Sequence, residues 1–326
     1  MMQEEAVSKR QWLTSEEFSD LLGAVNLLPG PASTKMAIFV GCSRAGWFGG
    51  LISGICTTLP ATLMMLPLAW AYLRYGGMPQ VAAIFAGMRP VIVVILLEAI
   101  IGLGRTSLRS VWLAALAFAA CLAGVNPLLV VAACAAISVG IRVPKLLSIE
   151  PVALSAIFAA FLKIGAVVFG SGYVLLAFFR TDLVDRLHWL SEGQLLDAVA
   201  AGQITPGPTF ASATFIGYLL AGLPGSMAAT VAVFMPSFVL AIAGAPLLEK
   251  IRDAKWAQPF LDGLNSGAIA LMAVVCYDLG RAAIASWFGA ALMLITSALV
   301  WKKVNPVWAI LMGSAAGLIK NYLHFP

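Results

Sequence analysis

The chain has 326 residues, of which 61% are hydrophobic and only 11% are charged, and its mean hydropathy is +0.95. Soluble domains carry roughly a quarter charged residues, so this composition excludes an ordinary soluble protein and indicates one that crosses a membrane several times. The net charge of +5 comes from Lys and Arg residues that stand singly between apolar runs, a pattern typical of topology signals and not of nucleic-acid binding. The five cysteines have no metal-ligand or redox spacing, so we expect no metal and no cofactor.

Apolar runs predict nine membrane crossings, besides two interrupted segments at 21–40 and 195–220. A mixed charged and apolar stretch over the first 22 residues predicts an interfacial helix whose apolar face holds Phe18, Leu21, Leu22 and Val25. The nine predicted crossings are 47–72, 81–103, 111–125, 128–141, 152–179, 227–248, 264–279, 282–300 and 307–319. The predicted fold class is therefore an all-α polytopic membrane protein.

A short motif occurs twice, once in each interrupted segment. Residues 26–35 read Asn-Leu-Leu-Pro-Gly-Pro-Ala-Ser-Thr-Lys, and residues 203–209 read Gln-Ile-Thr-Pro-Gly-Pro-Thr. Each Pro-Gly-Pro ends one helical segment and lets another begin, because proline removes a backbone donor and glycine admits unusual dihedral angles. An unpaired backbone group in hydrocarbon costs several kcal/mol, roughly, unless it is buried in protein or lines a polar cavity. We therefore predict that both breaks form walls of a binding site.

An overlay of the two breaks, with Pro29 against Pro206, indicates an internal repeat. Asp20 then meets Asp197, and with one residue deleted Gly46 meets Gly222. Further glycine and proline matches follow along both halves, and such internal symmetry is typical of transporter folds. We predict two repeats, residues 1–145 and 146–326.

The distribution of Lys and Arg in the loops predicts how the halves lie in the membrane. If each Pro-Gly-Pro helix is broken or re-entrant and returns to the side it entered from, most of these residues gather on one face, which the positive-inside rule makes cytoplasmic. The other face then holds Arg74, Arg180, Arg186, Arg281 and Lys320. Equivalent loops fall on opposite sides, so we predict inverted-topology repeats.

The chemistry around each break favours an anion. A helix N-terminus with free N–H groups stabilises negative charge, and hydroxyl side chains follow both breaks. Ser33, Thr34 and Lys35 follow the first, and Thr209 and Ser212 follow the second. This set suits a tetrahedral oxyanion. The alternative is that both breaks are ordinary kinks whose hydroxyls bond back to the helix.

Two cations lie deep within predicted crossings. Arg89 and Lys163 are each about 15 to 18 Å from a helix end at 1.5 Å per residue, where a cation needs a partner, water or a ligand. Both are candidate anion ligands, and a structural ion pair is the alternative for Arg89. Lys163 shares a helical face with Gly170. Glu98 is a candidate for proton coupling, with a Glu98–Arg105 pair as the alternative.

These residues resemble the chromate transporter (chromate ion transporter) family. The resemblance rests on Trp12-Leu13, Leu28-Pro29-Gly30-Pro31 and Arg44-Ala45-Gly46, which recur in weaker form in the second half, and it covers nearly the whole chain. It implies export of chromate, with sulfate as the related oxyanion, across the bacterial inner membrane, and hence chromate resistance.

Members of this family usually open each half with a membrane helix that ends in a Phe-Gly-Gly-Pro-like turn. Phe169-Gly170-Ser171-Gly172 resembles the second copy of that turn, whereas the overlay leaves no room for the first copy. The resemblance therefore implies a first repeat without its opening helix, and a homodimer or a partner subunit is expected to complete the site.

The candidate substrate-binding residues come from the two breaks, the two deep cations and the turn before the second break. They are Asn26, Pro29, Gly30, Pro31, Ser33, Thr34, Lys35, Arg89, Lys163, Gly170, Ser171, Gly172, Gln203, Pro206, Gly207, Pro208, Thr209 and Ser212. We see no catalytic set, so an enzyme is not expected. The alternative function is a non-transporting or partner-dependent membrane scaffold derived from such a transporter, which would bind neither chromate nor sulfate.

Overall fold

The computed structural model describes residues 4–9, 11–14, 18, 21, 25, 28–107, 153–168, 172, 174–244, 257–284 and 286–323. All regular elements in these ranges are helices, which confirms the all-α class. They are η1 (Glu4–Lys9), α2 (Ala32–Tyr75), α3 (Pro79–Ser107), α6 (Leu154–Val167), α7 (Val174–Phe179), η2 (Arg180–Arg186), α8 (Glu192–Ile204), η3 (Thr209–Ala211), α9 (Ser212–Gly244), α11 (Ala257–Ile284), α12 (Trp287–Trp301) and α13 (Pro306–Tyr322). The predicted crossings 111–125 and 128–141 lie outside the described ranges.

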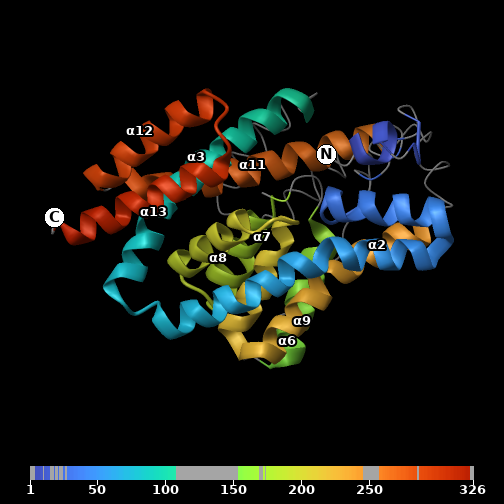
Figure 1. The fold of residues 1–326 in the computed structure, drawn as a ribbon, viewed down its shortest axis with the longest axis horizontal. Coiled ribbons are helices and arrows are strands. Elements are labelled where there is room, and N and C mark those ends of the chain that lie inside the picture. Colours follow the sequence, from blue (N-terminus) through green and yellow to red (C-terminus); the bar gives the residue numbers. More distant parts are fainter. Residues whose placement is uncertain are drawn as a thin grey trace.

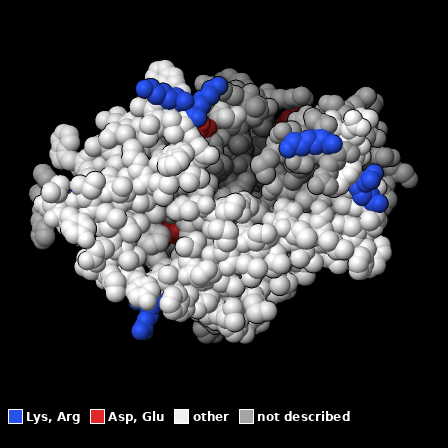
Figure 2. All heavy atoms as spheres, viewed as in Figure 1, with Lys and Arg blue, Asp and Glu red and all other residues white. Residues whose placement is uncertain are grey.

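Within the described ranges, three helical stretches are long and apolar enough to cross a membrane, namely 32–75, 79–102 and 209–244. Large apolar side chains on the surface fit the same environment. Trp287 and Trp301, at the two ends of α12, are 93% and 89% exposed, and aromatic residues favour the two membrane interfaces. On the face drawn in Figure 2, the Lys and Arg side chains of the described residues lie toward the edges. The exposed surface is therefore suited to lipid.

Helices α2 and α9 are each folded back on themselves by a sharp reversal. The reversal in α2 lies at Ala45 and Gly46, with φ and ψ of −143° and 30°, then 61° and −159°. The reversal in α9 has nearly the same angles at Ala221 and Gly222, namely −151° and 30°, then 61° and −148°. Positive φ is a region that glycine tolerates without steric penalty. The same hairpin thus occurs at two positions that the sequence overlay pairs.

Close glycine contacts hold the two legs of each hairpin together. A methyl group added at Gly217 would overlap the carbonyl of Gly225, and one added at Gly41 would overlap the carbonyl of Gly49. Residues eight apart in a straight helix are separated by about 12 Å, so these contacts exist only because the chain turns back. Small residues allow such close backbone approach in membrane helices.

The described helices form two groups (Figure 1). In one, α9 packs against both α2 and α6; in the other, α3 packs against α11, α12 and α13. The segment from α7 to α8 lies between them, and α8 contacts both α9 and α3. Each group contains one pair of helices that the sequence overlay makes equivalent: α2 and α9 in the first group, α3 and α11 in the second. Elements of the two sequence halves are therefore interleaved.

The two Pro-Gly-Pro breaks pack in a reciprocal manner. Gly30 (φ 101°) lies so close to Ser237 of α9 that a methyl group at Gly30 would overlap its side chain. Gly207 (φ 144°) lies against Ala61 of α2, whose Cβ would be 2.5 Å from a Cβ at Gly207. Ala61 and Ser237 directly follow Pro60 and Pro236, which the overlay pairs. Each break is thus seated on the long leg of the other hairpin.

Two predictions about the elements need revision. A single crossing over 152–179 is wrong, because α6 ends at Val167, Val168 is extended with ψ 111°, and α7 begins at Val174. The N-terminal stretch also packs into the protein: Phe18 and Val25 are buried in a cluster with Met36 and other apolar residues of α2 and α9. Hydropathy averaged along the sequence does not reveal that α6 ends at Val167, because glycine and serine lower the average only slightly.

The hairpin contacts predict a difference between two glycine substitutions. Gly217→Ala places a methyl group against backbone, whereas Gly280→Ala on α11 meets only Val93 at an ordinary 3.7 Å. Both changes gain about 1 kcal/mol of helix propensity, but overpacking costs about 1 to 3 kcal/mol. We expect thermal unfolding in detergent to show a lower Tm for Gly217→Ala than for Gly280→Ala. Equal stabilisation by both changes would contradict the hairpin geometry.

Candidate functional site

Arg89 of α3 forms a two-pronged ion pair with Asp197 of α8. Its Nε and Nη2 atoms each donate a hydrogen bond of 3.0 Å to one carboxylate oxygen. The Tyr72 hydroxyl of α2 donates a third hydrogen bond to Asp197, at 2.8 Å. Bidentate pairing of this kind is strong and orients the guanidinium. The predicted deep cation is therefore held by an acid on another helix, the alternative considered from the sequence.

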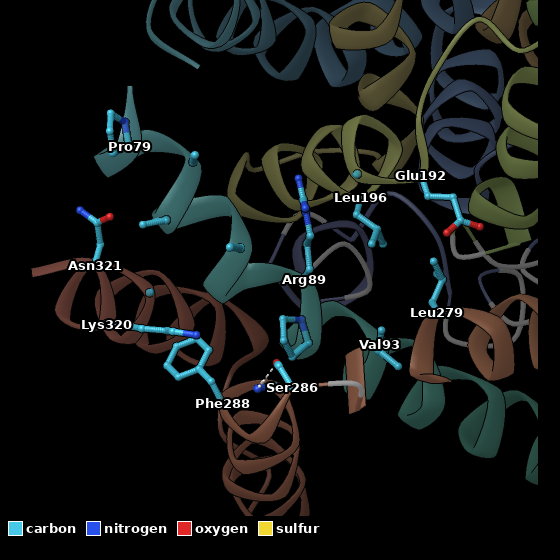
Figure 3. Close-up of a pocket in the computed structure, with 17 residues that line it drawn as sticks. Pro79, Arg89, Val93, Glu192, Leu196, Leu279, Ser286, Phe288, Lys320 and Asn321 are labelled. Atoms are coloured by element: carbon cyan, nitrogen blue, oxygen red, sulfur yellow. Dashed lines mark hydrogen bonds between the residues drawn. The ribbon is translucent and has the colours of Figure 1, made fainter. Parts of the chain in front are cut away.

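Arg89 also borders a large cavity. Its side chain is 40% exposed whereas that of Asp197 is 2% exposed. Two of the five guanidinium N–H groups bind Asp197, and the other three have no hydrogen-bond partner in the part of the chain that the structure describes. The cavity has a volume of about 840 Å³ and lies among α3, α8, α11, α12 and α13 (Figure 3). A charged, partly solvated donor at the wall of such a cavity can meet an incoming anion.

The cavity contains charges of both signs. Lys320 lies against the ring of Phe288, with its Nζ 5.2 Å from the ring centroid (Figure 3). Glu192 lies across the cavity and is bound by Arg180 at 2.8 Å, which also contacts Asp278 at 2.6 Å. Since the acids there are paired, Lys320 and the remaining donors of Arg89 are the groups best placed to attract a negative ligand.

Lys163 of α6 is also paired with an acid. Its Nζ donates to both carboxylate oxygens of Asp182 in η2, at 2.9 and 3.0 Å, and Arg186 approaches the same carboxylate at 3.2 Å. Asp182 is buried, with 4% of its side chain exposed. Two cations thus share one acid, so this cluster carries a net positive charge when all three groups are ionised.

At the first break, Lys35 is fully buried and its ammonium binds backbone. It donates to the carbonyl of Val25 at 2.8 Å and to the carbonyl of Leu28. The carbonyl of Val25 also accepts a 3.3 Å hydrogen bond from the N–H of Leu28, so Lys35 adds a second donor there. At the second break the Thr205 hydroxyl donates to the carbonyl of Gly202, the counterpart of Val25, at 3.2 Å. The two breaks therefore satisfy equivalent carbonyls with different side chains.

The remaining polar groups of the first break lie beside the start of α2. The N–H of Gly30 donates to the carbonyl of Val168 at 2.6 Å, so the break is joined to the end of α6. Thr34 is fully buried, and its hydroxyl has no hydrogen-bond partner within the described ranges. Ser33 is exposed. Pro29 and Pro31 flank Gly30, and the carbonyl of Pro29 accepts a 3.4 Å hydrogen bond from Ser237.

The second break borders a small cavity that unites several predicted residues. Gly172, Gln203, Thr209 and Ser212 all line it, and its volume is about 10 Å³, close to that of a single water position. The Nε2 atom of Gln203 is buried and has no partner among the residues described. Buried polar atoms without a partner are uncommon, so this donor marks a place where a ligand or water is expected. Pro206, Gly207 and Pro208 form the adjoining break.

The structure does not connect four other predicted residues with these cavities, three of them because they are not described. Asn26, Gly170 and Ser171 lie outside the described residues. Glu98 is exposed on α3 and lines neither cavity. Its coupling role stays a prediction, as do the anion-binding roles of the other predicted residues.

The sequence reasoning missed Asp182, Asp197 and Tyr72 as members of the site. A usable signal existed for Asp197, because an ionised residue within an apolar segment needs a partner. Asp197 stands alone in the apolar run 195–201, and the overlay had already singled it out. Matching each deep cation with the available deep acids would have reduced the choice to a few pairs.

The Arg89–Asp197 pair predicts non-additive effects on stability. Arg89→Gln leaves a buried carboxylate without its cation, and we expect a loss of about 3 kcal/mol. Asp197→Asn leaves a partly hydrated cation and should cost about 1 kcal/mol. The double variant should be more stable than Arg89→Gln alone, as measured by thermal unfolding in detergent with exposed Arg74→Gln as the control. Simple addition of the two effects would show that the pair is not coupled.

Comparison with known proteins assigns the chain to a family. The family model for chromate transporters matches residues 1–139 and 155–318. A chromate transport protein of Cupriavidus metallidurans is 29% identical, covering 98% of this chain and 86% of the relative, and one of Pseudomonas aeruginosa is 29% identical, covering 100% and 87%. An uncharacterized transporter of Methanocaldococcus jannaschii is 23% identical, covering 98% and 88%. No solved structure matches. The match along most of the sequence shows that this chain belongs to the chromate transporter family.

Proposed function

We propose that this protein exports chromate across the inner membrane of a bacterium and so confers chromate resistance, with sulfate as a related substrate. The observation that carries the proposal is the family match over most of the chain, together with relatives named as chromate transport proteins that match nearly the whole of this chain. The broken helices and buried cations fit a transported oxyanion.

The chemistry of the breaks supports an anion as the ligand. Chromate and sulfate are tetrahedral dianions that accept hydrogen bonds on every face. The start of α2 offers backbone N–H groups and the unpartnered Thr34 hydroxyl, and the second break offers the unpartnered amide of Gln203. Helix N-termini and neutral donors of this kind can bind an anion without a full counter-charge. The predicted residues of both breaks, with Arg89 and Lys163, are the proposed site.

The proposal includes two inverted repeats, residues 1–145 and 146–326. The near-identical reversals at Gly46 and Gly222 and the reciprocal seating of Gly30 and Gly207 support a pseudo-twofold relation. The family match also falls into two stretches, 1–139 and 155–318. In such transporters the substrate lies between the repeats at discontinuous helices, and the two Pro-Gly-Pro breaks are the proposed discontinuities.

The direct test is transport by inverted membrane vesicles that contain the chain. An exporter should accumulate labelled chromate in these vesicles, and unlabelled sulfate should compete. A scaffold would accumulate neither anion, and its expression would leave a chromate-sensitive bacterium sensitive. Uptake only by right-side-out vesicles would contradict the direction that we propose.

Matched variants separate an anion ligand from a structural cation. The double variant Arg89→Gln/Asp197→Asn removes the charge of Arg89 without leaving a buried unpaired acid. Loss of a charge that contacts a charged ligand costs about 2 kcal/mol or more, which corresponds to about a thirtyfold weaker affinity. We expect the double variant to fold and to lose chromate uptake, whereas Arg74→Gln keeps it. Normal uptake by a folded double variant would assign Arg89 a structural role.

A further inference from the structure

The two cavities lie along one helix interface. On α3, Arg89 and Val93 line the large cavity and Leu96 lines the small one. These residues are spaced by four and three positions, so they form one stripe. On α8, Gly193 and Leu196 line the large cavity, and Val199 and Gln203 continue the same stripe into the small one.

Only one helical turn separates the two cavities. Val93 and Leu96 are three residues apart, as are Leu196 and Val199, which is about 4.5 Å along each helix at 1.5 Å per residue. The side chains between the cavities are therefore aliphatic on both helices. Leu96 and Leu196 are almost fully buried, with 3% and 7% exposure. Such an apolar constriction excludes a hydrated ion when closed and passes it when widened.

The geometry points to a single anion pathway between α3 and α8, closed here by the aliphatic plug of Val93, Leu96, Leu196 and Val199. The inference rests on the proposed function for the identity of the anion. The large cavity is the vestibule, with Arg89 at its inner end. The small cavity, with Gln203, Thr209 and Ser212, is the inner seat next to the second break.

The Arg89–Asp197 pair is placed to keep this pathway closed. It connects α3 and α8 by two 3.0 Å hydrogen bonds just above the plug. Gly193 allows the guanidinium to lie against α8, because a Cβ at Gly193 would be 2.8 Å from Nη2 of Arg89. An oxyanion that binds the remaining N–H donors of Arg89 takes up part of the positive charge that holds the carboxylate of Asp197. Binding of the substrate therefore weakens the link that holds the two helices together.

The test is cysteine accessibility in the full-length chain after its five native cysteines have been replaced. Ser212→Cys places a thiol in the inner seat with little change in size, and Asn321→Cys places one at the vestibule. The probe is 2-sulfonatoethyl methanethiosulfonate, an anionic thiol reagent that does not cross membranes. It is added to right-side-out and to inverted vesicles, so that Asn321→Cys reports the side on which the vestibule opens.

Widening the plug should admit the reagent. We expect Leu196→Ala to accelerate labelling of Ser212→Cys from the vestibule side by about tenfold or more, because the smaller side chain widens the apolar constriction. Leu96→Ala on the facing helix should independently have the same effect. Leu195→Ala is the matched control, because Leu195 is adjacent on α8 and buried, with 1% exposure, but lines neither cavity. Size-exclusion profiles identify folded variants.

The outcomes are distinct. Equal labelling rates in the Leu196→Ala, Leu96→Ala and Leu195→Ala backgrounds, with Asn321→Cys labelled, would overturn the pathway. Faster labelling of Ser212→Cys from the membrane side opposite to the one at which Asn321→Cys is labelled would also overturn the pathway. Chromate added to the reagent should slow labelling of the widened variants. Acceleration without this protection supports the pathway and counts against chromate as its substrate.

Discussion

The need to pair every backbone polar group inside a membrane shapes this structure more than any other constraint. Each Pro-Gly-Pro leaves carbonyls and N–H groups that a continuous helix would have satisfied. Some of these groups form hydrogen bonds with backbone groups at other helix ends. The N–H of Gly30, for example, donates to the carbonyl of Val168 at the end of α6. Lys35 and Thr205 satisfy the equivalent carbonyls of Val25 and Gly202. The broken segments therefore depend on one another, and they lie together in the interior.

This dependence explains why the helices of the two halves interleave. Gly30 packs directly on α9, and Gly207 packs directly on α2. Both contacts are so close that a residue with a side chain would not fit. Neither hairpin can be packed without the other. The α3 group has no such breaks in its described part, and its helices meet through small residues such as Gly87 and Gly313. The α7–α8 segment connects the two kinds of packing, and both cavities lie beside it.

Residue types and their spacing in the sequence were sufficient to predict the helical class, the two breaks and the equivalent glycines of the two halves. They placed Gly46 and Gly222 in equivalent positions, and they grouped Gly172, Gln203, Thr209 and Ser212, which do line one cavity. They could not identify the partner of Arg89, because Asp197 is 108 positions away and only tertiary packing selects it. Hydropathy alone predicted one crossing over 152–179 although α6 ends at Val167, and only the family resemblance indicated a turn at 169–172.

The assignment of Lys35 shows why a charge at a helix start is ambiguous in sequence. A lysine after a Pro-Gly-Pro can face an anion at the new N-terminus or bind the carbonyls that end the previous segment. The second break distinguishes these roles, because Ser212 replaces Lys35 in the overlay while Thr205 takes over the carbonyl contact. A charge is therefore dispensable at this position when a neighbouring hydroxyl satisfies the backbone. By the same reasoning, the candidate ligand groups are those that have no partner among the described residues, namely the Thr34 hydroxyl at one break and the Gln203 amide at the other.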